Sequence, residues 1–445
     1  MNDEQAPWHI TVIGDARDAG PDRLGVKGWY LEQLEAGDFP TPPGFVIEAD
    51  AYREAIRLGR IDHRLAQIWE AARHSSPSDL PLLARKARHL IAGIEFSAGF
   101  QDSVQAHLDL LASRRSVADA DDELRVAVRS SATPGAVSGP ECAGVHSTYL
   151  SIAGLDRVLA RVHSCWASLF GERALAMRGH GLGDGDPSMA VVVQTMIDAD
   201  KSGFITPTGS PDEVLVEATF GFGEPIMSGA VEPDRYVVDR TRHVASSVTI
   251  GRKRIVLHRG PDTAVHRFAE PDRVRERVVD DAELAVLSTL SAAIDEHLGA
   301  LHEVEWSTDR TGVHAIQARP FTPTHHVDAP LIDACVNGIG IGLGWATGRV
   351  RVIDRYEELD ELRDGEILVT AETTPEWRPH IRRAAAVITD EGDTRCHAAR
   401  VAVEEGLPAI VGTKDATTEL ESGQYVTVDA SRGWVFPSVT FATST

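Results

Sequence analysis

Two short β-like runs joined by a polar turn predict a β-hairpin that carries chemically useful side chains: Glu303 to Trp306, and Val313 to Arg319. Side chains alternate along a strand, so Glu303 and Glu305 share one face, as do Gln317 and Arg319 on the partner strand. Oxygen ligands hold Mg²⁺ beside phosphates, and a guanidinium neutralises a phosphoryl group in transfer. The spacing therefore indicates a metal and phosphate site, with an exposed polar strand pair as the alternative.

His397 offers a second kind of chemistry. It stands at the predicted start of a helix, which follows an apolar strand ending at Thr389 and closes at Gly406. A helix N-terminus presents unpaired N–H groups and a partial positive charge, which stabilise a phosphoryl group added to an imidazole. The plainer alternative is an ordinary polar residue at the beginning of a helix.

Two further polar residues accompany apolar strands. Arg129 ends the apolar run that begins at Arg125, where a guanidinium needs an anionic partner or solvent. That partner is either a bound phosphate or a structural salt bridge. Gln194 lies inside the apolar strand Met189 to Met196, and its amide must find a partner if it is buried. ATP and a neighbouring backbone group are the two candidates.

Composition bounds the class of protein. The 445 residues include 67 acidic and 44 basic side chains, a formal net charge of -23, so the surface repels nucleic acid and anionic membranes. The start of the chain is acidic and polar, which argues against a secretory signal, and every apolar stretch is too short for a membrane span. The sequence therefore predicts a cytoplasmic protein. Four separated cysteines encode neither a zinc knuckle nor a disulfide framework.

The order of strand-like and helix-like runs predicts two lobes at the start of the chain. The first, 1–187, mixes short strands with helical patterns from Ala49 to about Ser116 and from Leu155 to Arg178. The second, 188–320, begins with the apolar strand that contains Gln194 and is rich in β-like runs. It ends, after a helix from Asp281 to about Leu298, in the hairpin.

A stiff, polar segment separates these lobes from a small carboxy-terminal domain. Pro320 to Pro330 contains three prolines and two histidines, so 321–335 is assigned as an interdomain hinge. Beyond it, 336–445 alternates strands with helices, among them Pro375 to Arg383 and His397 to Glu405. This alternation is typical of a compact α/β domain.

Several strings in the last domain match a known pattern: Gly365 to Val369, Thr373 to Trp377, Cys396 to Ala399, Gly406 to Gly412, and Gln424 to Asp429. They resemble the phosphohistidine domain of the enzymes that include phosphoenolpyruvate synthase, pyruvate phosphate dikinase and rifampicin phosphotransferase. There a Gly-Gly-x-Thr-x-His-Ala-Ala turn precedes Gly-Ile-Pro-Ala-Val-Val-Gly. The resemblance covers the domain end to end and implies that His397 carries a phosphoryl group.

The amino-terminal part resembles the same family. Gly25 to Gly28 followed by Pro42 to Phe45 is similar to the family's opening, in which a lysine contacts ATP phosphates. Lys27 takes that role by position, with a surface lysine before a helix as the alternative. The string Val126 to Thr133 is similar to the family's nucleotide-binding strand, and this likeness gives Arg129 a phosphate partner.

The hairpin also matches strings that end Glu-Trp and Gln-Ala-Arg-Pro in the family. Those strings supply a metal-binding glutamate, a glutamine and a phosphate-binding arginine. The likeness assigns Glu305 to Mg²⁺, with Glu303 as a second acid, and it assigns Gln317 and Arg319 to ATP. Gln194 is retained as a further candidate for nucleotide binding.

The resemblance implies a fold of α+β and α/β type, in which a two-lobed ATP-grasp-like nucleotide-binding domain precedes a small swivelling α/β phosphohistidine domain. The lobes close over ATP and Mg²⁺, the imidazole attacks the β-phosphate, and AMP is left once the γ-phosphate has been released as phosphate. Neutral imidazole is nucleophilic near neutral pH, and its phosphoramidate is a good donor. His397 then passes the phosphoryl group to a small-molecule acceptor, a metabolite or natural-product intermediate.

Departures from the family pattern keep alternatives open. The sequence after the phosphohistidine domain is too short for a pyruvate-binding barrel, and no helical acceptor domain fits between Arg319 and Leu331. The acceptor site is then expected at an interdomain cleft or on a partner protein. In the second case the chain is the energising subunit of a two-protein synthase. The family's second glycine and threonine are Asp393 and Arg395, and Arg395 is a candidate catalytic residue that compensates electrostatically. A phosphohistidine carrier or nucleotide-sensing regulator without turnover is the non-enzyme alternative.

Overall fold

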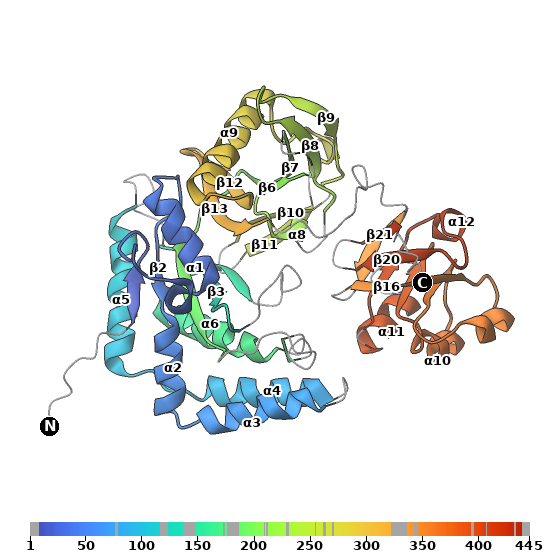
Figure 1. The fold of residues 1–445 in the computed structure, drawn as a ribbon, viewed down its shortest axis with the longest axis horizontal. Helices are drawn as coiled ribbons and strands as arrows, with labels where there is room; N and C mark the ends of the chain where they lie inside the picture. Colours follow the sequence, from blue (N-terminus) through green and yellow to red (C-terminus); the bar gives the residue numbers. More distant parts are fainter. Residues whose placement is uncertain are drawn as a thin grey trace, which may run out of the picture. The chain divides into compact units, whose positions relative to one another are not determined.

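The chain forms two compact units (Figure 1). The computed structural model describes residues 9–75, 79–115, 123–136, 147–171, 174–175, 187–208, 210, 212–227, 231–253, 255–260, 264–268, 271–321, 336–341, 345–392, 396–405, 407–430 and 433–437. The first unit comprises Met1–Gly223, Asp234–Ile250 and Val256–Thr324, and the second comprises Glu224–Pro233, Gly251–Ile255 and His325–Thr445. Of the predicted hinge, 321–335, only Phe321 lies within the described residues.

In the described part of the first unit, antiparallel strands form a sheet in the order β1-β2-β5-β3-β4: β1 (Ile10–Val12), β2 (Gly44–Ile47), β3 (Val126–Ala132), β4 (Thr148–Ile152) and β5 (Met189–Thr195). Strand β5 pairs with β2 and β3. It is buried on both faces, with Val191 and Val193 in one core and Ala190 and Val192 in another. The predicted lobe boundary at 188 is therefore wrong, because this strand belongs to the middle of the first sheet.

Helices cover both faces of this sheet. One core contains residues of α2 (Ala49–Leu58), α3 (Asp62–Arg73), α4 (Leu80–Ala92), α5 (Ala98–Ser113) and α6 (Leu155–Ala167). The helical patterns predicted from Ala49 to about Ser116 correspond to α2, α3, α4 and α5, and Gly59 and Gly93 stand at the ends of α2 and α4. Helix α6 ends short of the predicted Arg178 and continues as a 3₁₀ turn, Ser168–Phe170. Helix α1 (Pro21–Ala36) packs on the opposite face.

A second sheet of the first unit has the described order β13-β12-β6-β7-β8-β9: β6 (Lys201–Pro207), β7 (Glu213–Phe220), β8 (Asp234–Asp239), β9 (Ala245–Thr249), β12 (His302–Asp309) and β13 (Gly312–Pro320). It shares a core with α1 and with α9 (Asp281–Leu298). Asp280 and Glu283 cap the start of α9 reciprocally, and left-handed Gly299 ends it, which confirms the predicted helix. Shorter elements follow in the chain: β10 (Ile255–Arg259), β11 (Ala264–Phe268) and a 3₁₀ turn, Pro271–Arg273, whereas α8 (Glu224–Met227) is assigned to the second unit.

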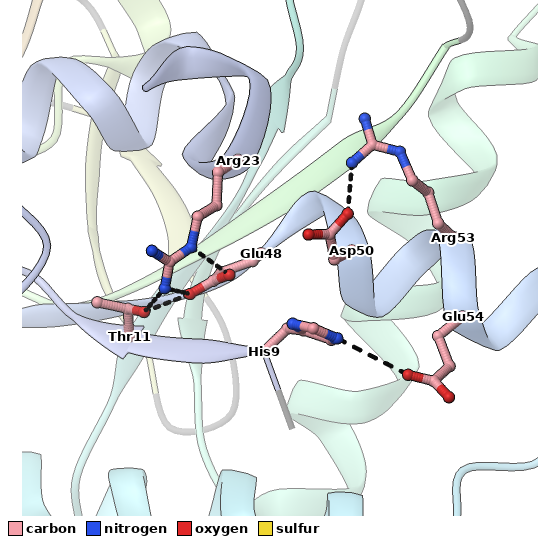
Figure 2. Close-up of polar contacts among 7 residues, drawn as sticks. All are labelled: His9, Thr11, Arg23, Glu48, Asp50, Arg53 and Glu54. Atoms are coloured by element: carbon pink, nitrogen blue, oxygen red, sulfur yellow. Dashed lines mark hydrogen bonds and ion pairs between the residues drawn. The ribbon is translucent and has the colours of Figure 1, made fainter. Parts of the chain in front are cut away.

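An ion-pair cluster fixes the beginning of α1 (Figure 2). Glu48 is buried, and it accepts hydrogen bonds from Arg23 Nε at 2.6 Å and Nη2 at 2.7 Å. Asp50 pairs with Arg53 at 2.6 Å. Potential ligand atoms of His9, Glu48 and Asp50 lie within 4.8 Å of one another, but each carboxylate already has an arginine partner. We therefore interpret the cluster as a structural link that joins α1 to the first sheet and to α2.

The second unit is built on a sheet with the described order β14-β21-β20-β16-β17-β18-β19-β15: β14 (Val336–Asn337), β15 (Ile339–Ile341), β16 (Trp345–Val352), β17 (Ile367–Thr370), β18 (Ala386–Thr389), β19 (Ala409–Val411), β20 (Tyr425–Asp429) and β21 (Trp434–Pro437). Strands β16 to β19 are parallel, and the flanking pairs are antiparallel. Apolar cores lie on both faces, as expected for a parallel centre. The predicted α/β character of this part is confirmed.

The helices of the second unit are short: α10 (Arg378–Ile381), α11 (His397–Glu405), α12 (Ala416–Glu419), and 3₁₀ segments at Tyr356–Glu361 and Pro375–Trp377. The helix predicted from Pro375 to Arg383 is a 3₁₀ turn followed by one turn of α-helix, because Pro379 removes a backbone donor. Among the helices that the structure describes, none combines the length and the hydrophobicity of a membrane span.

Candidate functional site

Strand β3 presents Arg129 from the middle of the first sheet. The residue pairs with Val192 of β5, and the strand continues to Ala132. Arg129 therefore lies inside the strand, whereas the sequence predicted that it ends the run. The ladder continues because Ser130 and Ser131 also pair with β5. Arg129 is 6% exposed, so its guanidinium requires partners inside the protein or from a ligand.

The β12–β13 hairpin has the predicted pairing. Glu303 lies opposite Arg319 and Glu305 lies opposite Gln317 in the antiparallel register. Val304, between the two glutamates, is fully buried, so the acids share the other face of the strand. Glu303 also forms an ion pair with Arg319. The hairpin therefore brings four of the predicted site residues onto one surface.

Arg129 joins the first sheet to this hairpin. Its Nη2 atom donates to Glu305 Oε2 at 2.5 Å and to Gln317 Oε1 at 2.8 Å, and Nη1 donates to the carbonyl of Ile316 at 3.1 Å. The Nε atom is buried and has no hydrogen-bond acceptor among the described residues. The structural salt bridge considered for Arg129 is thus formed, and the buried Nε–H of the same guanidinium has no acceptor among the described residues.

A sharp kink in α1 holds Lys27 near this cluster. Gly25 breaks the helix with φ 67° and ψ 168°, a conformation that favours glycine. Ser131 of β3 fastens the kink from both sides: its hydroxyl donates to the carbonyl of Leu24 at 2.8 Å and accepts from the N–H of Gly28 at 2.9 Å. Sequence reasoning missed this serine, although its place two residues after an arginine on a strand puts it on the same face.

The environment of Lys27 perturbs its charge. Burial lowers the pKa of Lys27 to about 8, because removal from water disfavours the ammonium form. The positive charge of Arg129 lowers this pKa further, and the negative charge of Glu305 acts in the opposite direction. Lys27 and Arg129 thus form a concentrated positive site that lacks full compensation.

Replacing Gly25 with alanine is expected to damage both stability and the position of Lys27. A Cβ atom there would lie 2.0 Å from the carbonyl oxygen of Ser131, and the backbone conformation is strained for alanine. We expect the free energy of unfolding to fall by more than the roughly 1–3 kcal/mol of backbone strain alone, with weaker ATP binding. Denaturant titration and calorimetry measure the two effects.

Gly154→Ala is the matched control. Gly154 has φ 81° and ψ 151° before α6, and its added Cβ atom would meet nothing within 4 Å. This variant should therefore carry the backbone cost alone and bind ATP normally. Equal losses of stability and ATP affinity in the two variants would contradict the proposal that the kink at Gly25 and its contacts with Ser131 position Lys27.

Gln194 has the backbone partner that the sequence left open. Its side-chain nitrogen donates to the carbonyl of Pro42 at 3.1 Å, and the residue is 2% exposed. In the ladder it lies between Gly44 and Ala127. The described hydrogen bond thus ties β5 to the segment before β2, and a contact with nucleotide stays a prediction.

The chemistry of the clustered donors fits a nucleotide with its metal. Two carboxylates and an amide oxygen are hard ligands of the kind that Mg²⁺ prefers beside phosphates. Lys27, Arg129 and Arg319 supply positive charge, and the unpaired Nε–H of Arg129 supplies a buried donor. Bound phosphate is an acceptor that would satisfy this donor.

His397 begins α11, as predicted, and is partly exposed. Its Nδ1 atom lies 2.9 Å from the hydroxyl of Thr373, which follows β17. If the hydroxyl donates, Nδ1 is the acceptor and the proton of the neutral ring resides on Nε2. If the hydroxyl accepts, Nδ1 carries the proton and the ring lone pair lies on Nε2. The second arrangement leaves Nε2 available as a nucleophile.

The surroundings of His397 include two more polar features. Cys396 Sγ accepts from the N–H of Ala399 at 3.4 Å and so caps the first turn of α11. Glu376 is exposed, and its pKa is held below the ordinary value first by a hydrogen bond from Thr374, with a smaller contribution from His397. Sequence reasoning assigned no role to Thr373, whose contact depends on the pairing of β17 with β18. Asp393 and Arg395 lie outside the described residues.

Family models match both parts of the chain. The model described as "Pyruvate phosphate dikinase, AMP/ATP-binding domain" matches residues 21–331, which include Lys27, Arg129 and the hairpin. The model described as "PEP-utilising enzyme, mobile domain" matches residues 362–433, which include His397. The two matches cover the candidate site and the phosphohistidine candidate separately.

Curated relatives extend this similarity over most of the chain. A probable phosphoenolpyruvate synthase of Archaeoglobus fulgidus is 35% identical over 429 residues, 93% of this chain and 56% of the relative. A probable phosphoenolpyruvate synthase of Methanothermobacter thermautotrophicus is 34% identical over 438 residues, 96% of this chain and 64% of the relative. The phosphoenolpyruvate synthase of Pyrococcus furiosus is 30% identical over 469 residues, with shares of 94% and 57%. The chain thus spans less than two thirds of each of these relatives.

The matched residues and the clustered side chains agree on one assignment. The chain belongs to the PEP-utilising family, in which an AMP/ATP-binding domain of the pyruvate phosphate dikinase type is combined with a PEP-utilising enzyme mobile domain.

Proposed function

We propose that this chain is an ATP-dependent phosphotransferase of dikinase type. ATP and Mg²⁺ bind at Lys27, Arg129, Glu305, Gln317 and Arg319, and His397 takes the β-phosphoryl group and passes it to a small-molecule acceptor. AMP and phosphate are the other products. This proposal extends the family assignment to an activity of this chain.

The contact of Arg129 with Glu305 and Gln317 is the observation that carries the proposal. These residues lie more than 170 positions apart in the chain, yet they converge with Lys27 on one polar cluster in the first unit. A cluster of hard oxygen ligands beside three cationic groups suits a polyphosphate with its metal better than a structural ion pair alone.

The two sheets of the first unit act in this proposal as the lobes of an ATP-grasp-like clamp. A hollow of about 30 Å³ near the passage from β5 to β6 is lined by Met196, Ile197 and Phe222 and by a larger number of charged and polar side chains. It lies at the Thr195 end of β5, whereas Arg129 pairs with Val192, about 10 Å along the strand. At this volume the hollow holds no more than about one water molecule, so it would receive the base of ATP only after the lobes open.

The imidazole of His397 acts as the nucleophile. Thr373 contacts Nδ1, so the ring lone pair lies on Nε2 when Nδ1 carries the proton. Nε2 attacks the β-phosphorus, and the bond to the oxygen that bridges to the α-phosphorus breaks and releases AMP. Water then removes the γ-phosphoryl group as phosphate, so one phosphoryl group stays on His397. The N-terminus of α11 stabilises the added negative charge.

The second unit swivels between the nucleotide and the acceptor in this proposal. The named activity of the relatives makes pyruvate the first acceptor to test. The acceptor site belongs either to this chain or to a partner protein. Turnover with pyruvate and the purified chain alone would favour the first version, whereas a single round per chain would favour the second.

Analysis of the nucleotide products tests the proposal. The purified chain is incubated with Mg²⁺ and ATP, and AMP, ADP and phosphate are quantified by chromatography over time. We expect AMP and phosphate in equal amounts, with a burst of one AMP per chain when no acceptor is added. Formation of ADP would contradict a dikinase, and an absence of any product would favour the carrier or regulator without turnover.

A further inference from the structure

The Arg129–Glu305 pair has a bearing on how nucleotide and metal bind. Arg129 donates through Nη2 to both Glu305 and Gln317, while its Nε–H is buried and lacks an acceptor among the described residues. In a guanidinium, Nε–H and one Nη2–H point the same way and form a fork for two parallel hydrogen bonds. Half of this fork is therefore free and half is held by the protein.

A phosphate group that binds Arg129 through both arms of the fork must compete for Nη2. Gln317 is neutral, whereas Glu305 adds a negative charge directly beside the incoming phosphate. Once separated from Arg129, the Glu305 carboxylate would face a polyanion in a partly buried site, and this like-charge contact is costly. A divalent cation that takes the carboxylate would remove that cost.

We propose that Glu305 masks Arg129 in the absence of metal, and that Mg²⁺ unmasks it by engaging the carboxylate. The Arg129–Glu305 pair then acts as a gate that makes nucleotide binding depend on the metal. This inference rests on the proposed function, since it concerns the same site. It adds that Arg129 contributes to ATP affinity only when Glu305 has another partner.

The hairpin provides a natural comparison for this gate. Glu303 lies two residues before Glu305 on the same face of β12, where it pairs with Arg319 and has no described contact with Arg129. Substitution of Glu303 thus removes an equal charge from the same surface without releasing Arg129. The two glutamates therefore separate unmasking of Arg129 from a general change in electrostatic potential.

The test is a set of affinities measured by titration calorimetry in the His397→Asn background, where ATP is not consumed. ATP is titrated with excess Mg²⁺ and, separately, with a chelator. With Glu305 present, Arg129→Met is expected to weaken Mg–ATP binding about tenfold or more and metal-free ATP binding only about twofold. In the Glu305→Gln background, the same substitution should weaken metal-free ATP binding about tenfold as well.

The Glu303→Gln background supplies the control, in which Arg129→Met should still have little effect on the binding of metal-free ATP.

Arg129→Lys is a second variant in case methionine prevents folding, as judged by thermal melts. Lysine keeps the charge opposite Glu305 but cannot form two parallel bonds, so it should lose affinity for Mg–ATP and not for metal-free ATP. Equal effects of Arg129 substitution with and without metal in every background would overturn the gate. If no form of ATP binds to the chain, the proposed function itself is wrong.

Discussion

Replacing His397 with asparagine is expected to abolish AMP formation from ATP while leaving ATP binding intact. Removal of a covalent nucleophile lowers turnover by roughly 10⁴-fold or more, which here means below detection. Binding should change by less than about twofold, because Lys27, Arg129 and the hairpin belong to the first unit and His397 to the second. Chromatography of the nucleotides and titration calorimetry measure the two quantities on the same preparation.

His380→Asn is the matched control for this substitution. His380 lies in α10 of the same unit, with its Nε2 atom 3.8 Å from Asp360, and it has no described contact with His397. It should keep AMP formation within about twofold of the unaltered chain. If the asparagine at 397 retained AMP formation, the nucleophile would have to be another group.

A second large effect is expected from the pH dependence of ATP binding. Only the ammonium form of Lys27 attracts phosphate, and the pKa of this lysine is about 8, so its charge is lost as the pH rises through that value. ATP affinity at saturating Mg²⁺ should therefore fall roughly tenfold between about pH 7 and about pH 9. Lys27→Met should weaken binding by about 10–100-fold at neutral pH and remove the pH dependence, because a charge-assisted hydrogen bond is lost.

Lys27→Arg is the informative companion, because arginine stays charged throughout this pH range. It should bind ATP with an affinity that varies little with pH. In the ligand-free protein, Lys27→Met should raise the melting temperature, because the half-buried ammonium is partly removed from water and methionine carries no such cost. A pH dependence that persisted in Lys27→Met would assign the titration to another group.

The parts of the site that could be predicted are those determined by local periodicity. Alternation along β12 and β13 places Glu303 and Glu305 on one face, and the register confirms it. The start of α9 could be predicted because its cap residues are adjacent in sequence. The start of α11 at His397 could be predicted because an apolar, strand-like run and a turn precede it in the sequence.

The parts that could not be predicted depend on contacts between distant segments. An apolar run such as β5 predicts a strand buried on both faces, but it does not show to which sheet the strand belongs. The predicted lobe boundary at 188 was wrong for that reason. The short strands β14, β15 and β21 contain too few residues to show a period. The clamp of Ser131 on the kink at Gly25, and the contact of Thr373 with His397, arise only once the sheets are assembled.

Mapping the phosphorylated residue in the intact chain is the most direct test of the proposal that His397 carries the phosphoryl group covalently. The protein is incubated with Mg²⁺ and ATP, digested at neutral pH to protect a phosphoramidate, and analysed by peptide mass spectrometry. We predict one phosphoryl group on the peptide that contains His397, lost on mild acid treatment and absent from His397→Asn. A phosphoryl group on a different residue, or AMP produced without any modified peptide, would contradict this assignment.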